Sequence, residues 1–406
     1  MLPPPGNARI LIFAHFVNTF GNGAYLTTSA LFLTRSVGLS PAQVALGLAV
    51  AAGVGMALST PMGYVADRYG AKHVMLGTLL LLAVAYAGLI AVRGVWSFTL
   101  LASVIAVCET CAKSANGAMV ATAVPPEQRL RLRAYLRSAN NAGIGLGALA
   151  GSLPLLLDTR AGYMAMLLGN TATFLLAATV LTRVRPAAPI PARPGDQPRL
   201  IALRDQPFLS FALVDGLVAS LYNEMLSFAL PLWLALRAHA PLWLVSATLL
   251  INTTGCVLFQ VWAARGADGP ASGAQVGRRG ALVVAGSCVL FGLTADLPVW
   301  LSCVAVLVAA AVHVLGELFL STGTWAVVFG LAPDWAQGQY QGAYLTGRQI
   351  GNMVTPPLLT ALVIGGGGPG WLAVGAIFVV AGLAYPRLVG WGIRTRAVAV
   401  PAGVHL

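Results

Sequence analysis

The stretch Gly63-Tyr-Val-Ala-Asp67-Arg68-Tyr-Gly70-Ala-Lys72-His73 separates two long apolar runs. Its charged side chains are too costly to hold in hydrocarbon, so they mark a boundary between membrane and water. Gly63 has no side chain and lets two helices meet closely, and Gly70 can adopt a backbone conformation that other residues resist. The stretch therefore predicts a tight polar turn between two membrane-spanning helices.

The composition argues against a soluble domain and favours a protein that crosses the membrane many times. Of 406 residues, 58% are hydrophobic and 9% are charged, whereas a soluble domain carries about 25% charged residues. The formal net charge is +12, and 22 arginines account for most of the basic residues. They lie in short segments between apolar runs, which indicates charges at a cytoplasmic membrane face and no nucleic-acid partner. The five cysteines lie in or beside apolar runs and are predicted to be small apolar side chains, neither disulfides nor metal ligands.

Twelve runs are long enough to cross the hydrocarbon core, which takes about 20 apolar residues. The predicted spans are 10–34, 42–63, 73–92, 96–121, 136–157, 161–182, 207–235, 241–263, 280–296, 298–329, 341–364 and 370–392. Nineteen basic residues lie at the ends and joints of one side, against four on the other: Arg35, Arg93, Arg160 and Arg237. By the positive-inside rule, both termini are expected in the cytoplasm of a multi-pass protein of the cell (inner) membrane.

The spacing Gly-x-x-x-Asp-Arg-x-Gly-x-Lys over residues 63–72 resembles the signature loop between helices 2 and 3 of the major facilitator superfamily. A proline-rich polar segment, 183–206, follows six spans and precedes six more. The resemblance implies an all-α integral membrane fold of twelve transmembrane helices in two pseudo-symmetric six-helix halves. We expect an N-terminal bundle over 1–182, a cytoplasmic linker over 183–206 and a C-terminal bundle over 207–406.

Ionisable residues inside the spans fall on every third helix. A charge at a helix centre costs about 2.5–3.5 kcal/mol on insertion scales, so such residues mark a pathway by default. The first, fourth, seventh and tenth spans line the central cavity in the family that the chain resembles. At about 100° per residue, each span presents its polar groups on a shared face. The predicted proton and substrate cavity residues are His15, Asn18, Asn22, Glu109, Lys113, Asn116, Asn223, Glu224, His313 and Glu317.

Each of these residues also has a purely structural interpretation. Glu109 and Lys113 stand one turn apart and can form a structural ion pair. His15 can bond a backbone carbonyl, and Asp215 reads as an interfacial or helix-starting acid. Glu224 and Glu317 have no cation one turn away and are the best candidates for binding and releasing a proton, because loss of water favours the neutral acid.

Two further motifs resemble the family with departures. Lys113-Ser-Ala-Asn116-Gly117 is similar to the Arg-x-x-Gln-Gly motif tied to proton transfer, with Lys and Asn in place of Arg and Gln. Gly143, Gly147 and Gly151 match the glycine spacing of the antiporter motif on helix 5, although the proline of that motif is missing. A generic small-residue packing face explains this spacing almost as well.

In the opening loop, the resemblance implies a gate formed by Gly63, Asp67, Arg68, Gly70 and Lys72. Asp67 is expected to pair with a cation or a helix N-terminus and to hold the two halves together in the outward-open state. Arg68 and Lys72 are expected to make cytoplasmic contacts. The alternative is that these charges only set the topology.

The function predicted from these features is secondary active transport by alternating access, favouring proton-coupled efflux of a drug-like or secondary-metabolite small molecule. Uptake of a small polar solute is the alternative within the same class. A membrane-embedded enzyme is a different class, and His313-x-x-x-Glu317 supplies too few ligands for its metal site. We expect no enzyme activity, cofactor or metal, and a monomer whose partners are a small molecule, protons and the lipid bilayer.

Overall fold

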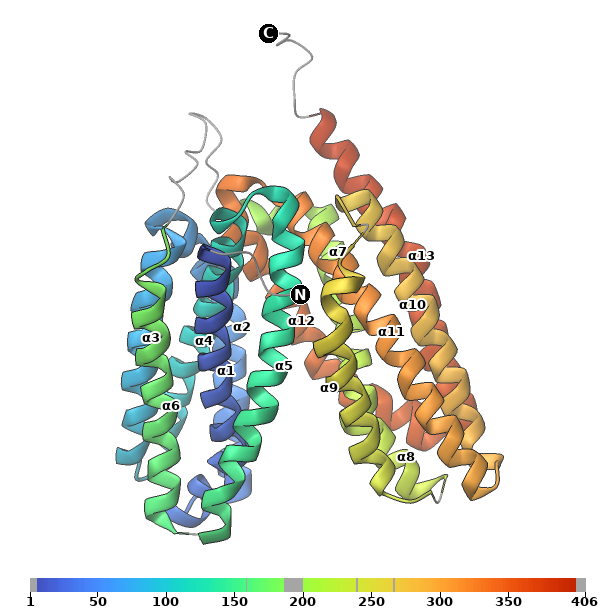
Figure 1. The fold of residues 1–406 in the computed structure, drawn as a ribbon, viewed down its shortest axis with the longest axis horizontal. Coiled ribbons are helices and arrows are strands. Elements are labelled where there is room, and N and C mark those ends of the chain that lie inside the picture. Colours follow the sequence, from blue (N-terminus) through green and yellow to red (C-terminus); the bar gives the residue numbers. More distant parts are fainter. Residues whose placement is uncertain (1–5, 158, 186–199, 239, 266, 399–406) are drawn as a thin grey trace. The chain divides into compact units, whose positions relative to one another are not determined.

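The computed structural model describes residues 6–157, 159–185, 200–238, 240–265 and 267–398, and this part is helical throughout, with no strand (Figure 1). Nine helical runs in it are long and apolar enough to cross a membrane. All twelve predicted spans lie in helices, apart from a residue or two at their ends. The all-α, multi-pass membrane architecture predicted from the sequence is confirmed.

The chain divides into two compact units, which are described separately. Unit 1 comprises Met1–Ile201 together with Asp334–Leu345, and unit 2 comprises Ala202–Pro333 and Thr346–Leu406. The boundary at 201/202 falls inside the predicted linker, whose residues 186–199 lie outside the described part. The sequence places Asp334–Leu345 in the C-terminal half, whereas the structure packs this segment against unit 1.

Six helices build unit 1: α1 (Asn7–Leu31), α2 (Pro41–Tyr69), α3 (Ala71–Gly88), α4 (Val95–Ala123), α5 (Pro126–Leu157) and α6 (Arg160–Leu181). The start of α2 carries a capping box, in which Ser40 Oγ accepts from the Gln43 amide and Gln43 Oε1 accepts from the Ser40 amide. Thr159 caps α6 in a similar way. Polar side chains at these ends satisfy the first backbone amides of each helix.

Unit 2 contains α7 (Gln206–Glu224), α8 (Leu230–Leu236), α9 (Trp243–Ala263), α10 (Pro270–Leu293), α11 (Val299–Leu331), the later part of α12 (Gln337–Leu359) and α13 (Gly366–Val398). The π-helical turn Met225–Ala229 joins α7 to α8, so both make up one predicted span. Asp205 caps α7 and also pairs with Arg396 near the end of α13.

Several helices extend beyond their predicted spans. Helix α2 continues from residue 63 to Tyr69, α5 begins at Pro126 instead of 136, and α10 begins at Pro270 instead of 280. An apolar run reports only the lipid-buried part of a helix, and the polar turns that follow it into water stay helical. The joint between α9 and α10 is therefore shorter than the sequence suggests.

Candidate functional site

A single residue, Gly70, separates α2 from α3. Its φ of 88° and ψ of 122° lie in a region that favours glycine, which confirms the conformation expected there. The predicted turn over 63–73 is wrong in its extent, because Gly63 and Asp67 lie inside α2. Gly63, Asp67 and Arg68 consequently lie in the last two turns of α2 and not on a loop.

The carboxylate of Asp67 accepts hydrogen bonds from two backbone amides at the start of α12. Oδ1 lies 2.6 Å from the Gly338 nitrogen and Oδ2 lies 2.9 Å from the Gln339 nitrogen. The first amides of a helix have no partner within the helix, and the helix dipole favours a negative charge beside them. Of the two partners expected for Asp67, the structure provides the helix N-terminus.

The approach of α2 to this segment is too close for a side chain at Gly63. A Cβ placed there would lie 2.5 Å from the carbonyl carbon of Gly338. One turn earlier, Ser59 Oγ donates to the Gly342 carbonyl across 2.6 Å. These backbone contacts explain why Asp334–Leu345 belongs to unit 1.

The two basic residues of the motif have different surroundings. Arg68 is exposed and donates to the Tyr64 hydroxyl on its own helix at 3.1 Å. Lys72 Nζ donates to the carbonyls of Thr182 at 2.8 Å and Val184 at 2.7 Å, just past the end of α6. A cation at this position complements the negative end of the helix dipole.

The three helix-5 glycines bring α5 against α1. A Cβ at Gly147 would lie 3.0 Å from the amide nitrogen of Ala24, and one at Gly151 would lie 2.8 Å from its Cα. Gly143 meets the Phe16 carbonyl at 3.0 Å in the same way. The close helix contact expected from the glycine spacing is therefore present.

On α4, Glu109 and Lys113 form an ion pair with Nζ–Oε2 of 3.4 Å. Glu109 Oε1 also accepts from the Tyr86 hydroxyl of α3 at 3.0 Å, and the Tyr86 ring packs edge-on against Tyr25 of α1. The Lys113 side chain is 59% exposed and that of Glu109 34%. The pair expected from the spacing exists, and its acid is tied to the neighbouring helix.

One turn after Lys113 on α4, Gly117 accommodates the side chain of Gln341. A Cβ at Gly117 would lie 2.5 Å from both Cγ and Cδ of that glutamine. The motif Lys113 to Gly117 thus contacts Asp334–Leu345 through its glycine.

Three of the predicted cavity residues, His15, Asn18 and Asn116, line a small hollow inside the unit-1 bundle. Its other walls come from α1, α3, α4 and α6 and include Met75, Leu79, Ala177 and Leu181. The polar face shared by α1 and α4 is thus turned at least in part toward α3 and α6 within the bundle. Asn22, one turn above Asn18, has its Oδ1 buried with no hydrogen-bond partner among the described residues.

In unit 2, Glu317 is buried between α11 and α9. Its side chain is 5% exposed, and His313, one turn earlier, is fully buried with Nε2 3.9 Å from Glu317 Oε2. From α9, Asn252 Nδ2 donates to Oε2 at 2.5 Å, and Cys256 Sγ lies 3.7 Å from Oε1. The structure therefore places this acid in the interface between α9 and α11.

The polar face predicted for the seventh span, which corresponds to α7, divides into two parts. Gly216 and Ser220 pack against α12, where Ser220 Oγ donates to Asn352 Oδ1 at 2.6 Å. Asn223 is exposed and Glu224 half-buried, with Ser227 donating to Glu224 at 3.2 Å. Only the second part is accessible.

The interpretation of Asp215 as an interfacial or helix-starting acid is wrong. It is 1% exposed and accepts hydrogen bonds from Thr324 of α11 at 2.7 Å and Tyr385 of α13 at 2.8 Å. Asp205 is the acid that starts α7. Three helices of unit 2 therefore meet at the Asp215 carboxylate.

Sequence reasoning also missed the partners of Glu317. Asn252 and Cys256 stand one turn apart on α9 and face its carboxylate. The i, i+4 spacing of two donors on α9 is the one signal that marked them. No group of three metal-binding side chains occurs in the described part, and the five cysteines there are free thiols.

Comparison with known proteins places the chain in a class. The family model of the Major Facilitator Superfamily matches residues 11–356. The chain belongs to the Major Facilitator Superfamily, whose members carry out secondary transport of small molecules across membranes.

The chain is similar to several solved transporters. A bacterial homologue of the iron transporter ferroportin in an outward-facing state matches with a TM-score of 0.74 and 15% identity over 96% of this chain and 100% of that one. The human organic anion transporter MFSD10 matches at 0.67 and 16%, covering 94% and 100%. The E. coli fucose:proton symporter FucP matches at 0.69 and 15%, covering 94% and 98%. At these identities the likeness concerns the fold.

A relative by sequence is the uncharacterized MFS-type transporter YqjV of Bacillus subtilis (strain 168). The two are 26% identical over 122 residues, which is 30% of this chain and 30% of the length of that relative.

Proposed function

We propose that this transporter couples movement of its substrate to protons and that Glu317 carries the proton. The observation that supports this is the buried pair of His313 and Glu317 on a membrane-spanning helix. A carboxyl group held in such a place is costly and marks an ion or proton pathway by default. Asn252 and Cys256 hold the carboxylate in one orientation.

Glu224 is the second proposed proton-binding acid and differs from Glu317 in accessibility. It is half-buried beside the exposed Asn223, so water or a cationic substrate reaches it more readily. We assign Asn223 to the substrate path with Glu224 in unit 2, and we propose a role in substrate binding for Lys113 and Glu109 of unit 1.

Export is the proposed direction, with a drug-like or secondary-metabolite compound as the substrate and the cell membrane as its location. The spacing of Gly143, Gly147 and Gly151, which resembles the antiporter motif, supports this direction. Proton-coupled uptake of a small polar solute is the second candidate, favoured by the fold shared with the fucose:proton symporter FucP.

The gate proposed from the opening loop rests on Asp67. Its two hydrogen bonds attach the start of α12 to α2, and the cytoplasmic side opens when they break. Gly63 allows α2 to approach the start of α12 closely, and Gly70 allows the one-residue joint between α2 and α3. Lys72 attaches α3 to the end of α6 at the proposed cytoplasmic end of unit 1, where Arg68 is exposed.

The test is transport in inside-out membrane vesicles with an imposed pH gradient, using a panel of drug-like cations and small sugars. Wild-type vesicles are expected to take up a drug-like compound only with the gradient, and a protonophore abolishes this uptake. Glu317→Gln and Glu224→Gln abolish coupled uptake while the protein remains folded. Glu127→Gln, at an exposed acid at the start of α5, is the control and leaves uptake unchanged. Wild-type rates in both glutamate variants contradict the assignment, and gradient-driven movement in the opposite direction supports uptake.

A further inference from the structure

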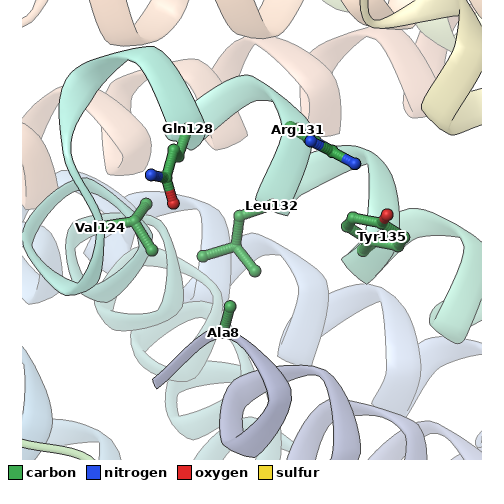
Figure 2. A pocket seen from close by; sticks show the side chains of 6 residues that line it. All are labelled: Ala8, Val124, Gln128, Arg131, Leu132 and Tyr135. Carbon is green, nitrogen blue, oxygen red and sulfur yellow. The ribbon is translucent and has the colours of Figure 1, made fainter. Parts of the chain in front are cut away.

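A cavity of about 160 Å³ opens between the first turn of α1 and the first turns of α5 (Figure 2). Its lining residues are Ala8, Val124, Gln128, Arg131, Leu132 and Tyr135. The four from α5 are spaced i, i+3, i+4 and i+7, so they share one face of the helix. Ala8, Leu132 and Tyr135 are buried and form an apolar floor, whereas Gln128 and Arg131 are exposed at the rim.

The charge at this rim belongs to a basic segment. Residues 126–137 contain Arg129, Arg131, Arg133 and Arg137 and one acid, Glu127. Arg129 forms an ion pair with Asp334 at 2.9 Å, and its side chain is 13% exposed. Among the four arginines only Arg131 is exposed. The cavity therefore combines an accessible cation with an apolar floor.

The arrangement of Arg131 over Tyr135 keeps the cation at the cavity. The guanidinium carbon lies 5.9 Å from the centroid of the Tyr135 ring. Arginine matches a phosphate by two parallel hydrogen bonds. Gln128, one turn before Arg131, also lines the cavity (Figure 2) and carries an amide donor.

The cavity lies at the end of unit 1 that the basic residues assign to the cytoplasm. Basic pockets between helices on that side of a membrane bind anionic lipid headgroups. We propose that this cavity binds an anionic membrane phospholipid, with the phosphate on Arg131 and Gln128 and the first methylenes of an acyl chain on Ala8, Val124, Leu132 and the Tyr135 ring. The buried apolar floor favours a lipid over a free phosphate ion, because the ion has no apolar surface to bury against it.

The test measures lipid retained by the full-length protein. Wild-type protein in nanodiscs of phosphatidylcholine with a fixed fraction of phosphatidylglycerol is released for native mass spectrometry, and bound phosphatidylglycerol is counted. Arg131→Gln is expected to lower the bound fraction about tenfold, the effect of losing one charge-assisted hydrogen bond. Arg131→Lys, which keeps the charge without the fork, gives an intermediate value. Val124→Phe, which fills the floor, also lowers retention.

The matched control is Arg387→Gln, which removes an exposed arginine of α13 that donates to the carbonyl of Leu383 on its own helix. It is expected to retain as much phosphatidylglycerol as the wild type, and thermal unfolding confirms that the variants are folded. Unchanged retention in Arg131→Gln or in Val124→Phe overturns the proposal, and so does an equal loss in Arg387→Gln, which indicates diffuse attraction. Displacement of the lipid by inorganic phosphate alone also overturns it in favour of a free-anion site.

Discussion

Asn252 Nδ2 on α9 donates a hydrogen bond of 2.5 Å to Oε2 of Glu317 on α11. The bond joins two helices of unit 2 at an acid whose side chain is 5% exposed. Replacing Asn252 by Leu leaves the buried carboxylate without this donor. Hydrogen bonds between membrane helices average about 0.6 kcal/mol, and those to charged groups reach about 1.5–3 kcal/mol.

We expect Asn252→Leu to lower the free energy of unfolding by about 1 kcal/mol, measured by thermal unfolding of the purified protein. Leu249→Ala, at an exposed position on the same helix, is the control. In the double variant with Glu317→Gln, the loss of unfolding free energy should be smaller than the sum of the losses in the two single variants, because the two residues share one hydrogen bond. Fully additive losses mean that the two side chains do not interact.

The close packing at Gly63 predicts a strong effect of one methyl group. Gly63→Ala places a Cβ 2.5 Å from the Gly338 carbonyl carbon, and overpacking of this kind costs about 1–3 kcal/mol. Gly53→Ala, on the same helix with nothing within 4 Å of the added Cβ, is expected to be neutral or stabilising. Thermal unfolding compares the two variants, and equal stabilities refute the contact.

The hydrogen bonds of Asp67 predict local protection of Asp334–Leu345. Asp67→Asn keeps the size of the side chain but removes its charge and one acceptor. The amides of Gly338 and Gln339 are expected to exchange about tenfold faster, read by hydrogen–deuterium exchange of peptides that cover this segment. Asp334→Asn, whose side chain is 51% exposed in its pair with Arg129, should change exchange little. An unaltered rate in Asp67→Asn contradicts the bond.

The contact of α5 with α1 predicts a contrast between two glycines of one helix. Gly147→Ala places a Cβ 2.9 Å from the carbonyl carbon of Phe20 and forces the helices apart. Gly145→Ala meets nothing within 4 Å. We expect the first to lower the unfolding temperature and the folded yield in detergent and the second to leave both unchanged. Similar behaviour of both variants removes the case for close packing at Gly147.

The membrane-spanning helices could be predicted from the sequence because the length of an apolar run has to match the thickness of the hydrocarbon core. The conformation of Gly70 followed from equally local chemistry, whereas a helix N-terminus was one of two partners for Asp67 that the family resemblance implied. Those arguments concern one helix at a time. They assigned Glu317 to a face of α11 but did not indicate that α9 covers that face with Asn252 and Cys256.

The misinterpretation of Asp215 has the same origin. Its neighbours Thr324 and Tyr385 lie 109 and 170 residues away in the chain. A helical wheel gives the direction of a side chain around its own axis, and no local pattern gives the identity of a neighbour so distant in sequence. The helices could be predicted, but which helices cover one another required the structure.

Gly70 is the single residue between α2 and α3, so no loop separates the two helices. We therefore expect α3 to follow any change in the orientation of α2. Lys72 near the start of α3 is hydrogen-bonded to the carbonyls of Thr182 and Val184. Those carbonyls stand where the chain leaves α6 on its way to the second unit. A longer joint would let the two helices reorient independently, whereas with one residue between them we expect a change at the Asp67 end of α2 to reach the end of α6.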